Sequence, residues 1–440
     1  MKANSRATIL SYNTDAERIC SSAARISTTA GSALELYEKA NDTEKNRNLI
    51  RGVIRSGHQS VIEHAVFHIA FNDVSVAVEE FVIEFRLASY TVKSRRYVDF
   101  GQMGYYEPQE LTAHGASLYR AHIESLFADY HTLTERGIPK EDARFVLPYA
   151  FFSNFYCTVN ARELIHMLCE MKYGRGSADP ELSALADQLI AQLEQCFPVA
   201  AEQVKPFADC NHPHRMPPRL RISDAPCEVK AAATLKYFPK DAAQILSEAV
   251  QILCPENTEL SAPDILTLLP RAAEQINLTY LIENLSLSSV THLVRHRMQS
   301  LVIPPLSTAD VMRYMVPDTI SAQEDLLALY RNAYARNAQT LRDLRKEGLT
   351  REVCLCLSGN TLNAMTTMNA RELMLFFRLR TCTRAQWEIR ETAQSMLRQA
   401  RQNLPGIFGS MGPSCVVLGH CPEGRMSCGR AEEMRGLFLS

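Results

Sequence analysis

An internal repeat constrains this chain more than any other feature. The string NAREL at residues 160–164 recurs at 369–373, an offset of 209 residues (369 − 160). Upstream, Glu63 matches Glu274 and Arg86 matches Arg297, both at an offset of 211 residues (274 − 63, 297 − 86). Matches in one order at nearly one spacing predict two tandem copies of one unit. The alternative is two unrelated helical domains with chance identities.

A proline-rich stretch, residues 210–228, separates the two halves and reads as a linker. We therefore predict a first copy over residues 1–212, a linker over 213–229 and a second copy over 230–440. Each half has an ordinary size for a single domain.

The periodicity of apolar residues predicts a mixed structure. Residues 65–71 alternate apolar and polar side chains and predict a strand. Residues 74–89 have spacing suited to a helix, and Thr43 is expected to cap a helix that runs to Ser56. Further helices are predicted over residues 118–136, 160–172, 181–197, 323–347 and 369–403. Many long helices with few strands indicate an α+β fold.

Composition excludes several partners. The formal net charge is −2, so no overall field attracts nucleic acid or an anionic membrane, and phosphate recognition must come from local arginines. We expect neither a signal peptide nor a transmembrane helix. Thirteen cysteines scattered through a long chain indicate reduced thiols and a cytoplasmic location.

Two arginine-rich segments are candidates for chemistry. Arg295-His296-Arg297 follows a predicted helix and could hold phosphate or the edge of a flavin ring. Residues 369–390 predict one helix in which Arg371, Arg378 and Arg380 gather near its start and middle. Guanidinium groups suit a bidentate grip on phosphate or a pyrimidine carbonyl. The alternative is a surface helix with arginines paired to glutamates.

Longer strings are more specific. Two sets of strings resemble the signature of flavin-dependent thymidylate synthases. The second half has RHR, then NARE and LR-x4-AQWEIR, and the first half has GHQSVIEHAVFHIAF, FRLASYTVKSRRYVDF, ARFVLP and NAREL. The resemblance implies α+β subunits that assemble as a homotetramer and bind FAD at subunit interfaces. It also implies methylation of dUMP at C5 with methylenetetrahydrofolate and NADPH, and no cysteine nucleophile.

The family's site residues are divided between the copies. The first copy has Glu84-Phe85-Arg86 where RHR should stand, but it keeps a loop with Ser94, Arg96 and Tyr97. The second copy keeps RHR but has other residues in place of that loop and of three further positions. The corresponding pairs are Ser94 and Pro305, Arg96 and Ser307, Arg144 and Val353, His58 and Leu269, and His64 and Gln275. Conversely, the base-gripping Arg380 has Met171 as its first-copy counterpart.

The resemblance therefore implies one nearly complete site made of both copies. In that site Arg380 and His58 are expected to act in catalysis. Substrate is expected at Ser94, Arg96, Arg144, His292, Arg295 and Arg380. FAD is expected at His58, Arg295, His296, Arg297, Asn369, Arg371 and His166. The two copies would form an intramolecular pseudo-dimer, and two chains a pseudo-tetramer with two working sites.

Departures from the family leave the substrate open. His292 replaces a glutamine, Val92 replaces an acidic residue, and Leu375 stands where the second copy should have a flavin-contacting Asn or His, although the first copy has His166. The alternatives to dUMP methylation are alkylation of another pyrimidine nucleotide and a non-catalytic protein that binds nucleotide or flavin.

The C-terminal segment is a separate question. It contains Cys415, Cys421 and Cys428, whose spacing is not a common one for zinc. We expect structural thiols and no metal, with zinc as the alternative.

Overall fold

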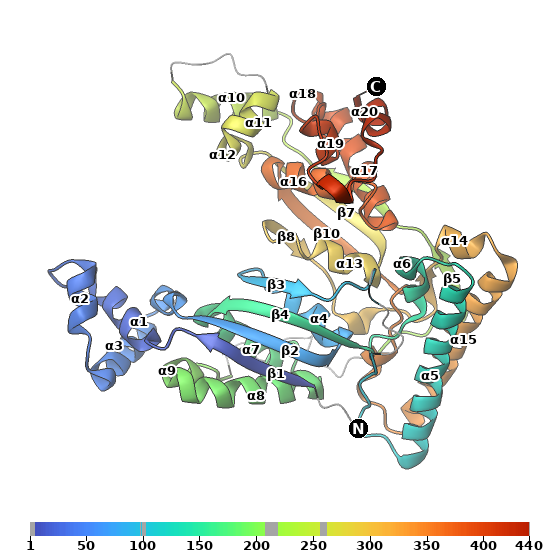
Figure 1. Ribbon diagram of the computed structural model, residues 1–440, viewed down its shortest axis with the longest axis horizontal. Helices are drawn as coiled ribbons and strands as arrows, with labels where there is room; N and C mark the ends of the chain where they lie inside the picture. Colours follow the sequence, from blue (N-terminus) through green and yellow to red (C-terminus); the bar gives the residue numbers. More distant parts are fainter. Residues whose placement is uncertain (1–4, 97, 99–102, 207–218, 256–261, 440) are drawn as a thin grey trace. The chain divides into compact units, whose positions relative to one another are not determined.

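The computed structural model describes residues 5–96, 98, 103–206, 219–255 and 262–439, which form two compact units (Figure 1). Unit 1 comprises Met1–Arg221 and Ala322–Leu357, and unit 2 comprises Ile222–Ser321 and Ser358–Ser440. Residues 213–218 of the predicted linker lie outside the described part of the chain.

Unit 1 is built on a four-stranded antiparallel sheet with the strand order β1-β2-β4-β3. Its strands are β1 (Arg6–Tyr12), β2 (Val66–Ser75), β3 (Ala88–Val92) and β4 (Phe152–Asn160). Helices α7 (Ala161–Lys172) and α8 (Pro180–Cys196) lie along one face of this sheet (Figure 1). Gln188 and Gln192 of α8 accept hydrogen bonds from the backbone of β1, and apolar side chains between these layers form the core.

The remaining helices of unit 1 surround this layer. They are α1 (Ala16–Arg25), α2 (Ala33–Lys39), α3 (Thr43–Arg55), η1 (Gln59–His64), α4 (Val76–Ile83), α5 (Ala113–Glu135), α6 (Lys140–Ala143), η2 (Arg144–Val146), α9 (Pro198–Ala201), α15 (Glu324–Lys346) and η5 (Glu352–Leu355).

Unit 2 repeats the plan, with the sheet order β6-β7-β10-β8 and a parallel pair β5-β9. Its strands are β5 (Cys227–Val229), β6 (Ala232–Tyr237), β7 (Asn277–Ser286), β8 (Gln299–Val302), β9 (Arg313–Met315) and β10 (Thr361–Asn369). Its helices are α10 (Ala242–Leu253), α11 (Ala262–Leu268), α12 (Pro270–Ala273), α13 (Leu287–Leu293), η4 (Leu306–Thr308), α14 (Asp318–Ser321), α16 (Ala370–Arg380), α17 (Trp387–Asn403), α18 (Pro405–Phe408), α19 (Ser414–Val417), η6 (Gly424–Met426) and α20 (Ala431–Leu439).

Local details repeat together with the strand order. Asp73 in β2 and Asn284 in β7 both have positive φ, 48° and 57°, at the expected offset. Each donates its backbone N–H to an asparagine in the neighbouring strand, Asn154 at 3.0 Å and Asn363 at 2.9 Å. Both sit where the strand register shifts, as expected of a β-bulge. A shared bulge with a shared partner is consistent with two copies of one fold.

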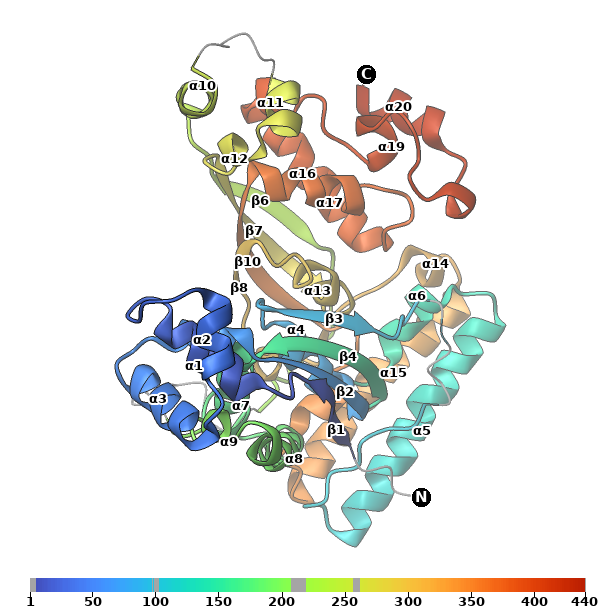
Figure 2. The same ribbon diagram turned by 60° about the vertical axis from the view of Figure 1, so that its left-hand side comes forward.

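The compact units do not coincide with the predicted copies. Helix α15 belongs to the second copy by sequence, yet it packs beside α5 in unit 1 (Figures 1 and 2). The Tyr334 hydroxyl donates to the Phe145 carbonyl at 2.8 Å, and buried Arg351 forms 2.8 Å ion pairs with Asp179 and Glu181. Residues 322–357 thus complete the body of the first copy. The copy boundaries themselves stay a prediction.

The strand at 65–71 is confirmed within β2, and most predicted helices are confirmed, with three corrections. Residues 74–89 are not one helix, because Ser75 still pairs with β4 before it caps α4, and Ala88 already pairs with β4 in β3. The helix expected from Thr43 is capped by Asp42, whose carboxylate accepts from Lys45 N.

The third correction concerns residues 369–403, which form two helices rather than one. The chain breaks after Arg380, and the Gln386 side chain starts α17 by accepting from Ile389 N at 3.0 Å. This start places the buried Glu388 carboxylate against Ser286 at the end of β7, where it accepts the backbone N–H at 2.7 Å. A carboxylate buried in this way requires such partners, so they fix where α17 begins.

Candidate functional site

In unit 2, three side chains form a hydrogen-bonded chain. His296 lies in the turn after α13, while Glu372 and Arg380 project from the two ends of α16. The Glu372 Oε1 atom lies 3.0 Å from His296 Nδ1, and Arg380 Nε donates to His296 Nε2 at 3.0 Å. Arg380 Nη2 also reaches the His292 carbonyl at 3.4 Å. We call Glu372, His296 and Arg380 the polar triad.

The contacts within the polar triad define the protonation state of His296. Because Nε2 accepts a hydrogen bond from a guanidinium group, it carries no proton, and the proton resides on Nδ1 facing Glu372. Burial lowers the pKa of His296, and the nearby Arg380 charge lowers it further, against the opposing effect of Glu372. The ring packs edge-on against Phe376, with 4.9 Å between centroids. A neutral imidazole therefore links a carboxylate to an arginine.

Other predicted residues of unit 2 lie in the same two segments as the polar triad. Arg295 and Arg297, on either side of His296 in the sequence, are both exposed. Asn369 caps α16 by accepting from Glu372 N at 2.9 Å. Arg371 forms an ion pair with Glu274. Both residues belong to the sequence matches that reveal the repeat.

The first copy has lost the polar triad. The counterparts of His296 and Arg380 are Phe85 and Met171, both buried among apolar side chains. Glu163 keeps the place of Glu372, and it accepts from Leu87 N at 3.3 Å and lies 3.5 Å from His166 Nδ1. The His166 ring in turn packs edge-on against Phe85 at 5.3 Å. An apolar contact has therefore replaced the arginine–imidazole bond.

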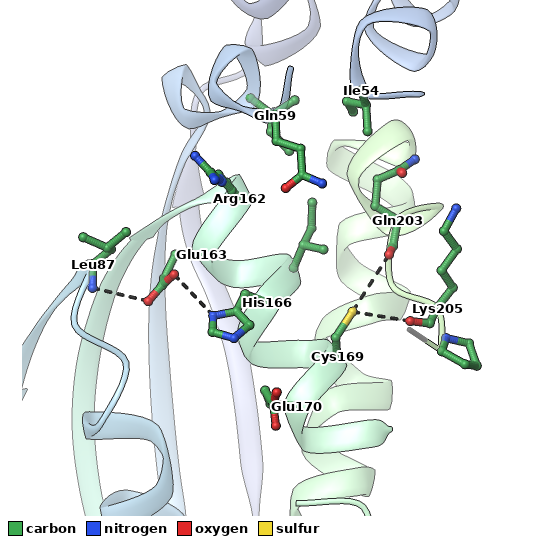
Figure 3. Close-up of a pocket in the computed structure, with 13 residues that line it drawn as sticks. Ile54, Gln59, Leu87, Arg162, Glu163, His166, Cys169, Glu170, Gln203 and Lys205 are labelled. Carbon is green, nitrogen blue, oxygen red and sulfur yellow. Dashed lines mark hydrogen bonds and ion pairs between the residues drawn. The ribbon is translucent and has the colours of Figure 1, made fainter. Parts of the chain in front are cut away.

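A cavity of about 630 Å³ lies beside α7 of the first copy (Figure 3). Apolar walls from Ile54, Ile62 and Leu87 combine with polar side chains such as Gln59 and His166. The bond to Glu163 raises the pKa of His166. Such a volume, with apolar walls and a few polar groups, suits a small organic ligand.

In unit 1, an arginine cluster lies at the loop after β3 and the start of η2. Arg144 Nε donates to the Glu141 carbonyl at 3.1 Å, and Arg96 Nε donates to the Glu141 carboxylate at 2.8 Å. Arg144 is 3% exposed, and its Nη2 has no hydrogen-bond partner among the described residues. Burial and the charge of Arg95 lower the pKa of Arg144 to about 10. A buried cation with an unsatisfied donor is suited to an anionic ligand.

Comparison with known proteins gives the family. The profile of the family described as "Thymidylate synthase complementing protein" matches residues 8–199 and 229–406. The chain belongs to this family. Because the profile matches twice, the comparison supports the tandem arrangement, and the prediction of an enzyme of the flavin-dependent thymidylate synthase type is confirmed at the level of the family.

Individual proteins are similar to parts of this chain. A flavin-dependent thymidylate synthase of Geobacter sulfurreducens is 36% identical over 194 residues, covering 41% of this chain and 83% of the relative. One of Clostridium tetani is 34% identical over 186 residues, covering 38% of this chain and 74% of the relative. A solved structure titled as the UMP/dUMP methylase PolB from Streptomyces cacaoi, bound with 5-Br dUMP, is 26% identical and covers 46% of this chain and 94% of its own, with a TM-score of 0.39.

The structure of this thymidylate synthase family member brings together two of the expected groups. His296, Arg380 and His292 meet in unit 2, and Arg96 and Arg144 meet at Glu141 in unit 1. His58 is exposed before η1, Ser94 lies at the turn where Arg96 N donates to its hydroxyl at 3.4 Å, and Tyr97 is outside the described residues. A site composed of both copies stays a prediction.

Sequence reasoning missed an inner set of residues in unit 1. Arg95 is buried and pairs with Glu79 at 2.6 Å, while Tyr149 donates to Glu80 at 3.2 Å. The available signal was the pair of glutamates inside the otherwise apolar string VAVEEFVI. Two acidic residues on a buried helix require a cation, and the structure shows that Arg95 supplies it.

Three cysteines of this family member lie in the segment from α19 to the start of α20. Among the described residues, no three His, Cys, Asp or Glu side chains have a geometry that could hold a metal ion. Cys415 is buried in α19, which raises its pKa, whereas the nearby Thr383 hydroxyl lowers the pKa of Cys428. No described helix is long and apolar enough to cross a lipid bilayer.

Proposed function

We propose that this chain is an FAD-dependent enzyme that methylates dUMP at C5 to give dTMP, with methylenetetrahydrofolate as carbon donor and NADPH as reductant. Each chain would hold one working site, formed by the first copy's arginine cluster and the second copy's polar triad. The two copies would act as an intramolecular pseudo-dimer, and two chains as a pseudo-tetramer. The packing of α15 from the second copy on α5 of the first supports the intramolecular pairing.

The observation that carries the proposal is complementary loss. The second copy has the polar triad. In the first copy, Phe85 and Met171 replace its histidine and its arginine. Conversely, Arg144 is buried with an unsatisfied donor in the first copy, and its second-copy counterpart is Val353. Neutral drift would have removed residues from both sets. Retention of one set by each copy supports selection for a shared site.

The chain offers suitable groups for a flavin. Arg295 and Arg297 are exposed cations beside the polar triad, suited to phosphate groups. On the neighbouring helix face, Leu375 and Leu379 are each 45% exposed, and such apolar side chains suit a planar ring. In the first copy the same face carries His166 and lines the cavity in Figure 3. When bound, the flavin supplies the hydride that completes the methyl group.

Arg380 has the central role in the proposed chemistry. Attack by C5 of the pyrimidine requires negative charge to accumulate on a ring carbonyl oxygen. Because His296 and the His292 carbonyl hold Arg380, its guanidinium group is oriented before substrate arrives and can stabilise that charge. His296 stays neutral and serves as an acceptor, and Glu372 orients it. Arg144 and Arg96 would bind the nucleotide's phosphate.

A second candidate is alkylation of a different pyrimidine nucleotide. Val92 stands where the family has an acidic residue and cannot make a hydrogen bond with its side chain. His292 replaces a glutamine, although its ring can still hydrogen-bond. These two changes would affect how the sugar and base are recognised, and they leave the C5 chemistry untouched.

The test is tritium release from [5-³H]dUMP with FAD, NADPH and methylenetetrahydrofolate present. Release by the wild type and its loss in Arg380→Ala would support substitution at C5 with Arg380 in the site. A flavin-loaded wild type that releases no tritium from dUMP would contradict the dUMP assignment. The same assay with 5-tritiated UMP then decides whether the second candidate holds.

A further inference from the structure

The arginine cluster of unit 1 continues inward into a buried network. Arg95 Nη2 lies 2.6 Å from Glu79 Oε1 and 3.7 Å from Glu80 Oε1. Glu79 also accepts from the Ser153 hydroxyl, and Glu80 accepts from Tyr149 at 3.2 Å. Glu79 is fully buried and Glu80 is 2% exposed. The two carboxylates on α4 therefore fix the guanidinium group of Arg95 in the interior.

Arg95 and Arg144 each have a buried nitrogen that makes no hydrogen bond to the described residues. Arg95 Nη1 and Arg144 Nη2 are both buried, and neither has a hydrogen-bond partner among the described residues. The two charges are close enough that Arg95 contributes to the lowered pKa of Arg144. Buried N–H donors without acceptors cost free energy, as do two like charges side by side. An anion at Arg144 would accept from Arg144 Nη2 and offset the repulsion between the two charges.

The acidic side chains compensate only part of this positive charge. Glu79 pairs with Arg95 and Glu141 with Arg96, at 2.6 and 2.8 Å, and no carboxylate of the described residues forms an ion pair with Arg144. Glu80 also lies beside Arg95, and burial raises its pKa to about 8. It is therefore mostly protonated near neutral pH and adds little negative charge to offset Arg144.

We propose that Arg95 is a positioning residue for the nucleotide's phosphate: held by Glu79 and Glu80, it supplies a second positive charge behind Arg144, so that the site selects a phosphate-bearing nucleotide over the nucleoside. This inference rests on the proposed function, which places the phosphate at Arg144 and Arg96. Arg95 itself stays buried, 6% exposed, and acts through Arg144. The sequence resemblance assigned no role to this position.

The proposal predicts a dependence of nucleotide affinity on pH. Four groups face Glu80: Arg95, Glu79, Glu84 and Tyr149. As the pH rises through about 8, Glu80 ionises and offsets the charge of Arg95 behind the bound phosphate, so affinity falls. Below roughly pH 6 the phosphate gains a proton, and affinity falls again. Affinity should therefore be highest between these limits.

The test is titration calorimetry with dUMP and with deoxyuridine, on the wild type and on Arg95→Met, Arg95→Lys and Glu80→Gln. Arg95→Met should weaken dUMP binding on the order of tenfold and leave deoxyuridine binding and kcat at saturation unchanged. Arg95→Lys, which keeps the charge, should recover part of the loss. Arg120→Met, which removes an exposed cation paired with Glu107 on α5, should match the wild type.

Glu80→Gln keeps the shape of the network and tests the proposal even if Arg95→Met does not fold. It should bind dUMP like the wild type near neutral pH and lose the decline above pH 8. The proposal is overturned if folded Arg95→Met binds dUMP normally or weakens both ligands equally, or if Glu80→Gln keeps the decline. If the wild type binds no dUMP, the proposed function is overturned as well. If the wild type turns dUMP over normally but the variants give the contrary results above, only this inference is overturned.

Discussion

Arg380 Nε and His296 Nε2 lie 3.0 Å apart, with the arginine as donor. This contact joins α16, the helix that begins within NAREL, to the RHR turn, two motifs separated by more than seventy residues in the sequence. It keeps the imidazole neutral and orients the guanidinium group. Since its first-copy counterparts are Met171 and Phe85, the same contact distinguishes the two copies.

Replacing Arg380 by alanine should lower kcat by about 10²–10³-fold, because a preoriented donor to the developing oxyanion is lost. The fold should persist, since Arg380 is only partly buried. The measurement is the tritium-release rate at saturating dUMP. The matched control is Met171→Leu at the corresponding first-copy position, which should retain the wild-type rate. Equal losses in both variants would indicate a general structural effect.

Glu372 and Glu163 provide a second matched pair. Glu372→Gln keeps the side chain's size but weakens the grip on His296 Nδ1, so Arg380 loses its orientation and kcat should fall by roughly tenfold or more. Glu163→Gln removes the same charge from a copy without a polar triad and should leave kcat near the wild-type value. Steady-state kinetics of both variants, with melting temperatures, provide the comparison. A larger effect at Glu163 would refute the assignment of the working half.

The exposed arginines at the RHR turn should govern flavin content. We expect the double variant Arg295→Ala/Arg297→Ala to lose most bound flavin, because it removes the two cations proposed to bind the flavin's phosphate groups. The ratio of visible to ultraviolet absorbance of the purified protein measures this without any turnover. Arg398→Ala, an exposed cation on α17, is the control. A double variant as yellow as the wild type would show that flavin is held elsewhere.

Patterns in the sequence predicted the repeat, the strand at 65–71 and most long helices, because these features follow from recurring strings and local periodicity. The two-helix arrangement of 369–403 was not predictable, since the break depends on Glu388 reaching Ser286, more than one hundred residues away. The place of α15 in unit 1 likewise depends on long-range contacts of Tyr334 and Arg351. Arg295 and Arg297 are exposed, as expected for arginines in a turn. The pairing of Arg95 with Glu79 could be seen only from three-dimensional contacts.

His122 should make the protein sensitive to acid. It is buried on α5, its Nε2 lies 2.9 Å from Asn337 Oδ1, and burial lowers its pKa to about 4. The unfolded chain takes up the proton near pH 6.5, so the free energy of unfolding falls as pH drops from there toward 4. The loss between about pH 7.5 and 5 should be roughly 2 kcal/mol.

Urea unfolding of the wild type and of His122→Gln at the two pH values measures this loss. Glutamine can still donate to Asn337 but does not titrate, so the variant should lose about 2 kcal/mol less on acidification. His131→Gln, on the same helix but only partly buried, should behave like the wild type. An acid loss of equal size in His122→Gln would contradict the assignment.

The central claim is that two incomplete copies provide one complete site. The number of dUMP molecules bound per chain, measured by titration calorimetry on the flavin-loaded protein, tests it most directly. Because only the first copy retains Arg144 and only the second retains Arg380, the account predicts one nucleotide per chain. Two equivalent nucleotides per chain would contradict it, since each copy would then bind substrate without the residues that it has lost.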